Sequence, residues 1–197
     1  MLTQGVGRVR HAVDVEHRDR ATLDAGRDHI LASPRDEGRI DLIVRRPEVE
    51  ERETVVEATL DTVEGLVGDC WRARGSSSTP DGSANPKAQL TLMNARVAAL
   101  VAVTPERIPL AGDQFYVDFD LTAANVPPGT RLTLGTAVIE VSDDPHLGCR
   151  KFFDRFGNDA HRFVNSKETR ELNLRGVNAF VVTGGTVRAG DTIRKTA

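Results

Sequence analysis

The sequence predicts a mainly β fold in which a few peripheral helices surround a closed β-barrel. Short segments rich in β-branched and aromatic residues recur along the chain, and Gly or Pro turns separate them. Only a few segments carry apolar residues at the spacing of a helix. Many short strands joined by tight turns are typical of barrels, because closure removes the exposed edges of a sheet.

The first part of the chain, residues 1–38, is expected to be an N-terminal extension with a helix that packs on the barrel. Within it, residues 18–32 place apolar positions among charges at helical spacing. Pro34 ends this pattern, because the residue before a proline leaves helical geometry. The remainder, residues 39–197, is expected to form the barrel as a single structural unit.

Individual elements are predicted from periodicity. Strands are expected where β-branched residues nearly alternate with polar ones, at residues 39–45, 54–60, 114–121, 131–134, 136–141, 176–183 and 191–196. Helical spacing predicts two further helices, at residues 94–103 and 159–167. The Ser-, Gly- and Pro-rich residues 75–86 cannot bury one face, so they are predicted to be a mobile loop.

Composition argues against several classes of protein. The 197 residues carry 26 Lys and Arg against 29 Asp and Glu, a net charge of -3, whereas duplex-binding proteins usually have a basic excess. The longest apolar run, residues 97–103, is far shorter than the ~18 to 20 residues that span a bilayer. The start has no apolar stretch that could act as a secretory signal. We therefore expect a cytoplasmic protein that binds neither nucleic acid nor membrane.

The most informative segment follows a predicted strand, where the chain must turn, and reads DPHLGCRKFF. Its Cys149 is the best candidate for a reactive residue, because a thiolate is both a nucleophile and a soft-metal ligand. Arg150 and Lys151 follow directly and would favour the charged form of the sulfur. His146 could move a proton or orient the sulfur, and Gly148 would let a ligand come close.

Other interpretations of the cysteines remain open. Cys149 could be a buried structural cysteine whose basic neighbours point to water. His146 and Cys149 supply two zinc ligands, but no other histidines show a paired spacing, so structural zinc is not expected. Cys70 stands beside the sole tryptophan, Trp71, which favours a packed core thiol. A redox pair of Cys70 with Cys149 requires a proximity that the sequence does not show.

Aromatic and basic residues crowd the segment after Cys149. Four of the seven phenylalanines lie there with two arginines between them, at Phe152, Phe153, Phe156, Phe163, Arg155 and Arg162. Such a set can hold a flat heterocycle and its phosphate. The stronger interpretation is that the rings pack a loop and a short helix onto the barrel.

Five motifs in a fixed order make the chain resemble the MOSC domain, the family named for the C-terminal domain of molybdenum cofactor sulfurases. They are GLVGDCW from Gly65, LAGDQ from Leu110, PGTRL from Pro128, HLGCRKF from His146 and RGVNA from Arg175. The series spans most of the chain from about residue 39 onward, as in a stand-alone bacterial MOSC protein. The resemblance implies a distorted closed β-barrel with peripheral helices, and it places the family's characteristic cysteine at Cys149.

The resemblance also implies a cofactor. In the family this cysteine carries sulfur as a persulfide or binds molybdenum in the pyranopterin cofactor, and the same roles are expected of Cys149, with His146 as its catalytic neighbour. The residues expected around molybdenum cofactor (molybdopterin) are Gly148, Asn178, Asn94 and Arg96 in the pocket and Arg150, Lys151 and Arg175 at the phosphate. Cys70 is a departure, because the family more often has Arg there.

The size and the cysteine count of the chain indicate which partners it would need. It is too short for a pyridoxal phosphate domain, and two cysteines are too few to hold an iron-sulfur cluster, so neither group is expected. Sulfur would have to come from a cysteine desulfurase, and electrons from an electron-transfer protein. The role of Cys70 and that of residues 75–86 stay open.

Three functions remain as hypotheses. The first is a molybdenum-dependent reductase that acts on N-hydroxylated bases or amidoximes as small-molecule substrates. The second is a non-catalytic sulfur carrier that holds a persulfide on Cys149. The third is an interaction domain without chemistry, which a fully buried Cys149 would favour. The sequence leaves open whether the protein is an enzyme, either a reductase or a sulfur transferase.

Overall fold

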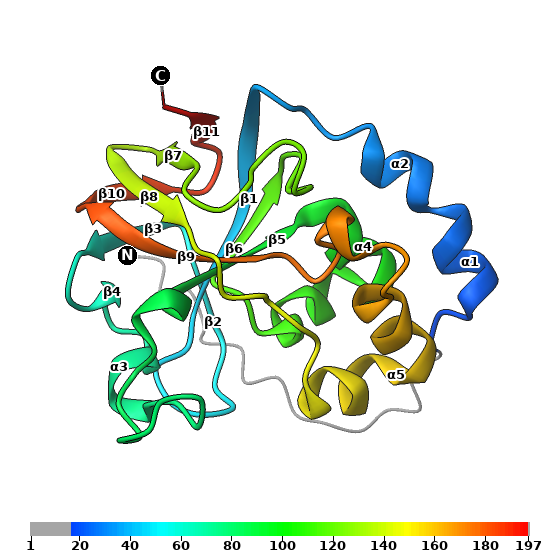
Figure 1. Cartoon of the computed structure of the whole chain (residues 1–197), viewed down its shortest axis with the longest axis horizontal. Coiled ribbons are helices and arrows are strands. Elements are labelled where there is room, and N and C mark those ends of the chain that lie inside the picture. Colours follow the sequence, from blue (N-terminus) through cyan, green and yellow to red (C-terminus); the bar gives the residue numbers. More distant parts are fainter. Residues whose placement is uncertain (1–16, 197) are drawn as a thin grey trace, which may run out of the picture.

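The computed structural model describes residues 17–196, and strands form its centre. The strands are β1 (Glu37–Arg45), β2 (Glu53–Val55), β3 (Glu57–Asp61), β4 (Gly65–Leu66), β5 (Leu90–Asn94), β6 (Phe115–Asp118), β7 (Arg131–Leu134), β8 (Ala137–Val141), β9 (Val177–Thr183), β10 (Gly185–Arg188) and β11 (Thr192–Lys195). A barrel runs in the order β11-β7-β8-β9-β5-β6-β1 and closes because β1 also pairs with β11. β2 extends β1 outside this ring, and β10, β3 and β4 form a separate small sheet (Figure 1). The predicted closed barrel is confirmed.

Helices lie outside the barrel, most of them on one side of it (Figure 1). They are α1 (Arg20–Ala25), α2 (Arg27–Leu31), α3 (Trp71–Arg74), α4 (Ala95–Ala102) and α5 (Arg150–Asn165), with 3-10 turns η1 (Pro86–Ala88), η2 (Pro105–Ala111) and η3 (Arg170–Leu172). α1, α2, α4 and α5 pack together, whereas α3 lies apart from them, and Cys70 before it hydrogen-bonds to Arg46 directly after β1. Among the helices of residues 17–196, none is long and apolar enough to cross a membrane.

Two hydrophobic cores share the wall of the barrel. On β6, Phe115 and Val117 point into the barrel and Tyr116 points to the helices, as the alternation of a strand requires. On β1, Ile40 and Ile43 both face the interior, because a bulge shifts the register after Ile40. The inward side chains of these strands thus fill the barrel, and their outward side chains pack against the helices.

One pair of barrel strands, β5 and β6, is parallel. A parallel pair needs a long crossover, and here α4 and η2 supply it. α4 begins after Asn94, whose side chain accepts hydrogen bonds from the backbone N–H groups of Arg96 and Val97. The crossover ends directly before the segment that carries Asp113.

The N-terminal region differs from the single helix predicted at residues 18–32. The chain forms α1 and α2, which meet at Gly26. A Cβ at Gly26 would lie 2.5 Å from Leu100 Cδ2 of α4, so a larger residue there would have to displace the Leu100 side chain. β1 begins at Glu37, and the division of the chain at residue 38 stays a prediction. The first 16 residues lie outside the described part, so the expectation that they contain no secretory signal stays a prediction.

The largest difference concerns α5, since the spacing predicts a helix only at residues 159–167. Phe152, Phe156 and Phe163 are buried along this helix, but Gly157 interrupts it with φ 84° and ψ 174° and hides the pattern. β5 and β10 are also absent from the predicted strands. β5 is buried on both faces and therefore shows no alternation, and β10 begins in a predicted Gly turn. Residues 75–85 form neither helix nor strand. Their mobility stays a prediction.

Candidate functional site

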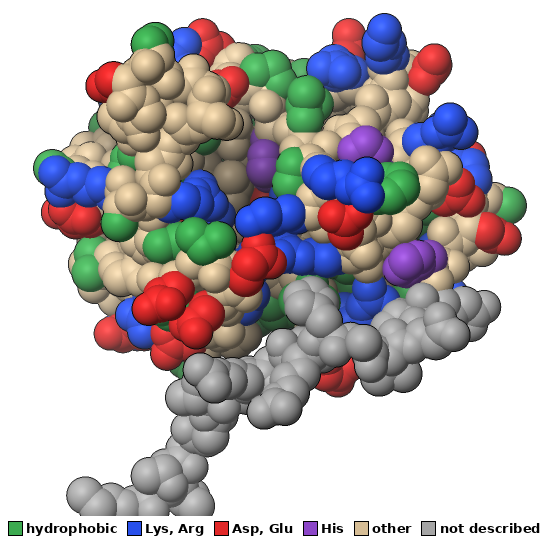
Figure 2. Space-filling model, turned by 90° about the horizontal axis from the view of Figure 1, so that it is seen from below, with side chains coloured by type: hydrophobic (Ala, Val, Ile, Leu, Met, Phe, Trp, Pro, Cys, Tyr) green, Lys and Arg blue, Asp and Glu red, His purple; other side chains and the backbone are tan. Residues whose placement is uncertain are grey.

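A pocket of about 260 Å³ lies between the β1–β2 loop, α3 and the start of α5. Both cysteines, Cys70 and Cys149, line it. Its basic lining residues are Arg46, Arg52, Arg74, Lys151, Arg155 and Arg175. Figure 2 shows Lys and Arg side chains beside a hollow in which a histidine is visible. The pocket therefore combines sulfur with a concentration of positive charge.

Cys149 is an exposed free cysteine at the N-cap of α5. Its backbone is extended, with φ -89° and ψ 179°, and its side chain makes no capping hydrogen bond. The sulfur is thus accessible and uncommitted, and the alternative of a buried structural cysteine is wrong. Cys70 is half-buried and free.

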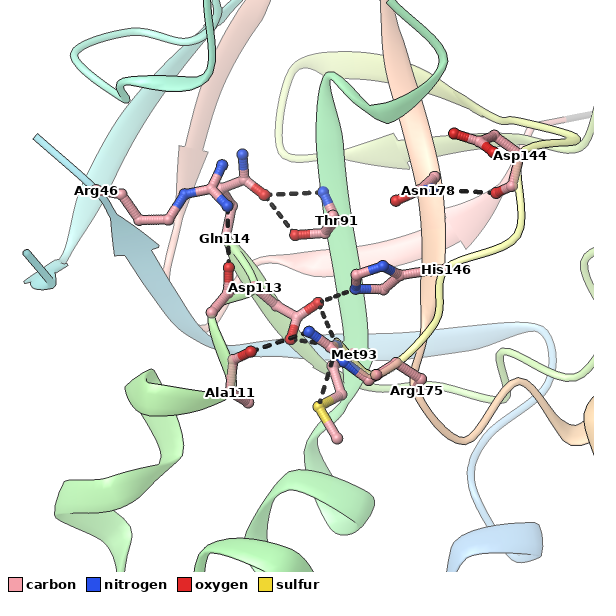
Figure 3. A network of polar contacts seen from close by, with 12 residues as sticks. Arg46, Thr91, Met93, Ala111, Asp113, Gln114, Asp144, His146, Arg175 and Asn178 are labelled. Carbon is pink, nitrogen blue, oxygen red and sulfur yellow. Dashed lines mark hydrogen bonds and ion pairs between the residues drawn. The ribbon is translucent and has the colours of Figure 1, made fainter. Parts of the chain in front are cut away.

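His146 belongs to a buried polar network at the inner end of the pocket (Figure 3). Its Nε2 lies 2.8 Å from Asp113 Oδ1. The guanidinium of Arg175 donates to both oxygens of Asp113, at 2.9 and 2.7 Å, and to Ala111 O at 2.9 Å. Asp113 therefore joins two residues of the pocket from beneath.

The charges of this network follow from its burial. Burial opposes the charged form of Asp113, but Arg175 and His146 outweigh it and lower the pKa of that carboxyl to about 2. Burial and the Arg175 charge lower the pKa of His146 despite Asp113. A charged Asp113 can only accept, so neutral His146 donates from Nε2 and keeps Nδ1 as a free acceptor.

A second buried ion pair supports the wall of the pocket that carries Cys70, opposite Cys149. Arg46, directly after β1, donates from Nε and Nη2 to the two oxygens of Asp69, each at 2.8 Å. The same carboxylate accepts from the backbone N–H groups of Arg46 and Trp71. The Gly-Asp-Cys-Trp turn is thereby held against β1, which brings Cys70 to the pocket.

Positive charge is in excess around Arg52. Burial and the charges of Arg155 and Arg46 lower the pKa of Arg52, and its Nε is buried without a hydrogen-bond partner. Glu50 is the acidic neighbour that pairs with both Lys151 and Arg155. Such an arrangement can accept an anion such as a phosphate.

The structure brings five of the residues predicted for the site to one pocket. They are Cys149, His146, Lys151, Arg175 and Asn178. Asn178 Nδ2 donates to Asp144 O at 3.1 Å, and its Oδ1 is buried without a partner. Gly148 lies behind the lining, where its backbone contacts Asn165.

Three other predicted residues lie away from the pocket. Arg150 is exposed and pairs with Asp154 one turn along α5, because the side chain after the N-cap points to solvent. Asn94 caps α4, and Arg96 pairs with Asp118 and donates to His29 O. Both are committed to the crossover between β5 and β6.

Sequence reasoning misses the residues that reach the pocket from elsewhere in the chain. These are Arg46, Arg52 and Arg74 on its surface and Asp69 and Asp113 beneath it, whereas Arg155 belongs to the aromatic and basic set that the sequence already singles out. The two aspartates stand in Gly-Asp dipeptides, which are typical of turns. Burial of such a carboxylate against a distant arginine leaves no local signal. The described residues contain no group of three or more His, Cys, Asp or Glu side chains placed to bind a metal.

The fold and the pocket define a class of protein: a β-barrel that presents an exposed cysteine beside a basic pocket. A family model for the MOSC domain matches residues 83–194, more than half of the chain. The protein belongs to the MOSC domain family. No curated protein matches the chain.

Solved structures of other proteins share this fold. The YUAD protein from Bacillus subtilis superposes with a TM-score of 0.56 at 17% identity, covering 80% of this chain and 94% of that one. YiiM from Escherichia coli gives 0.50 at 20% identity, covering 81% and 70%. YiiM from Geobacillus stearothermophilus gives 0.53 at 13% identity, covering 82% and 75%. At these identities the likeness shows the fold.

Proposed function

We propose that this protein binds molybdenum cofactor in the basic pocket, with Cys149 as a ligand of molybdenum. The MOSC domain family is associated with this cofactor. The observation that carries the proposal is the exposed, uncommitted thiol of Cys149 on a pocket rich in arginine. A soft thiolate suits molybdenum, and arginines suit the phosphate of the cofactor.

The unpartnered polar atoms of the pocket fit this cofactor. Arg52 Nε and Arg175 Nε are buried donors without acceptors, and Asn178 Oδ1 is a buried acceptor without a donor. Buried polar groups in a folded protein normally have partners. A heterocycle with ring N–H and carbonyl groups and a phosphate tail would supply both kinds. Arg52, Lys151 and Arg155 would hold the phosphate.

We further propose that the activity is reduction of N-hydroxylated bases or amidoximes. When bound, the cofactor would supply two-electron redox chemistry. Loss of the hydroxyl oxygen as water consumes two electrons and two protons. His146 can hold a proton at Nδ1, because Asp113 orients its ring through Nε2. The electrons would come from a separate electron-transfer protein, and a cytoplasmic location is part of this proposal.

The test is elemental analysis of protein purified from a host that makes the cofactor. Near-stoichiometric molybdenum is expected in the wild type and in Cys70→Ala, and its loss is expected in Cys149→Ala with the fold intact. Molybdenum retained by Cys149→Ala would contradict the assignment of the ligand. Reduction of an amidoxime by the loaded protein with a chemical electron donor would then test the substrate class.

A second candidate is a non-catalytic sulfur carrier with a persulfide on Cys149. The exposure of this thiol favours it, because a cysteine desulfurase must reach the sulfur. A mass increment of one sulfur on Cys149, absent from Cys149→Ala, is expected after incubation with such an enzyme. Repeated absence of the increment would count against it. The third hypothesis, an interaction domain, would be favoured by a fully buried Cys149. Cys149 is exposed, so this observation does not support it.

A further inference from the structure

The residue directly before Cys149 is held by the far end of the helix that Cys149 begins. Gly148 donates its backbone N–H to Asn165 Oδ1 at 2.8 Å, and Asn165 Nδ2 donates to Gly148 O at 3.0 Å. One side-chain amide thus makes both bonds that a neighbouring strand would make. Its orientation is fixed, because exchange of the nitrogen and oxygen would set donor against donor and acceptor against acceptor.

A straight helix could not bring these two residues together. α5 has 16 residues, which would extend about 24 Å at 1.5 Å per residue. Gly157 breaks it with a positive φ of 84°, so its second part turns back toward its start (Figure 1). The kink at Gly157 and the contact at Gly148 are therefore two parts of one arrangement.

His161 completes the contact. Its Nε2 lies 2.9 Å from Gly148 O and 3.0 Å from Asn165 Nδ2, so it can donate to the first or accept from the second. Phe153 packs edge-on against its ring at 5.7 Å between centroids. A Cβ at Gly148 would lie 2.9 Å from Asn165 Nδ2, so a larger residue there would have to displace the Asn165 amide.

We propose that Asn165 is a positioning residue for Cys149. By holding both backbone groups of Gly148, it fixes where the chain enters α5 and so where the sulfur meets the pocket. His161 can add one bond at Gly148 O, and the next polar anchor before Cys149 is the bond from His146 to Asp113, three residues earlier. The geometry stands on these contacts, and its consequence for the cofactor rests on the proposed function.

The first variants are Asn165→Ala and Asn165→Asp, with Asn158→Ala as the control. Asn158 is an exposed asparagine of the same helix, and within residues 17–196 its side chain hydrogen-bonds to its neighbour Asp159 alone. In Asn165→Ala the Gly148 amide is expected to exchange hydrogen at least fivefold faster, measured by mass spectrometry on the metal-free protein. Asn165→Asp keeps the acceptor for this amide and is expected to retain most of the protection. The control is expected to match the wild type.

Molybdenum content separates positioning from a purely structural role. It is expected to fall at least threefold in Asn165→Ala and less in Asn165→Asp, with melting temperatures close to that of Asn158→Ala. Wild-type exchange in Asn165→Ala, or faster exchange with unchanged molybdenum, would overturn the proposal. If Asn165→Ala fails to fold, the same comparison of molybdenum in Asn165→Asp decides.

A failure of the proposed function can be distinguished from a failure of the role proposed for Asn165. If the wild type binds no molybdenum, the cofactor assignment fails, and the readout becomes alkylation of Cys149 by iodoacetamide relative to Cys70 in the same chain. A ratio that changes at least threefold in Asn165→Ala supports positioning of the sulfur by Asn165. An unchanged ratio overturns it.

Discussion

Arg175 and Asp113 form an ion pair of 2.7 Å that is nearly closed to solvent, with side chains 5% and 0% exposed. Arg175 lies two residues before β9, and Asp113 lies two residues before β6. The pair therefore ties two loops that meet beneath the pocket. Because the same carboxylate also binds His146, this pair sets the orientation of the imidazole that lines the pocket with Cys149.

Asp113→Asn is expected to lower the free energy of unfolding by about 3 to 5 kcal/mol, because it leaves the charge of Arg175 buried without a partner. Urea unfolding followed by circular dichroism measures this change. Asp143→Asn is the control, since Asp143 pairs with Lys87 in an exposed position and its loss should cost less than about 1 kcal/mol. Equal losses in the two variants would show that the buried pair contributes little.

Sequence reasoning could locate Cys149, His146 and Lys151 because they are close together in the chain, and it could place β7 from its alternation alone. It could not find the arginines of the opposite wall. Arg46 meets Asp69 across a separation of 23 residues, and no local pattern records such a contact. Asn94 is a different case, because asparagine suits a pocket or a helix N-cap equally well, and here its side chain caps α4.

The buried imidazole predicts a dependence of stability on pH. Since the pKa of His146 is lowered on folding, the unfolded chain binds a proton below its ordinary value of about 6.5 while the folded protein does not. The free energy of unfolding is therefore expected to fall as the pH decreases from about 6.5. In His146→Gln this slope should be smaller directly below about pH 6.5, as measured by urea unfolding at each pH. A slope unchanged by the substitution would mean that folding does not lower the pKa of His146.

Glu50 is expected to compete with anionic ligands, because its carboxylate pairs with Lys151 and Arg155 at the pocket. Glu50→Gln removes this competitor and keeps the size of the side chain. Pyrophosphate should then bind at least threefold more tightly by calorimetry, and added salt should weaken binding in both proteins. Glu64→Gln, which breaks the exposed pair with Arg72, is the matched control. Equal affinity in Glu50→Gln and the wild type would exclude a phosphate site at these two cations.

Gly176, directly after Arg175, should tolerate no side chain. Its φ is 104°, and a Cβ would lie 2.0 Å from Leu92 O on β5. Gly129 also has a positive φ, 88°, but a Cβ there meets nothing within 4 Å. Gly129→Ala is therefore expected to cost about 1 to 2 kcal/mol from backbone strain alone. Gly176→Ala should cost about 2 kcal/mol more, because the backbone of β5 must also move.

Chemical unfolding of the two variants separates the cost of backbone strain from the cost of the steric clash with β5. If Gly176→Ala costs no more than Gly129→Ala, the turn can move away from β5 and the position of Arg175 does not depend on it. If the larger cost is found, the displaced turn should also carry Arg175 away from Asp113. Molybdenum content should then fall in Gly176→Ala and stay unchanged in Gly129→Ala, because only the first substitution disturbs the support of His146.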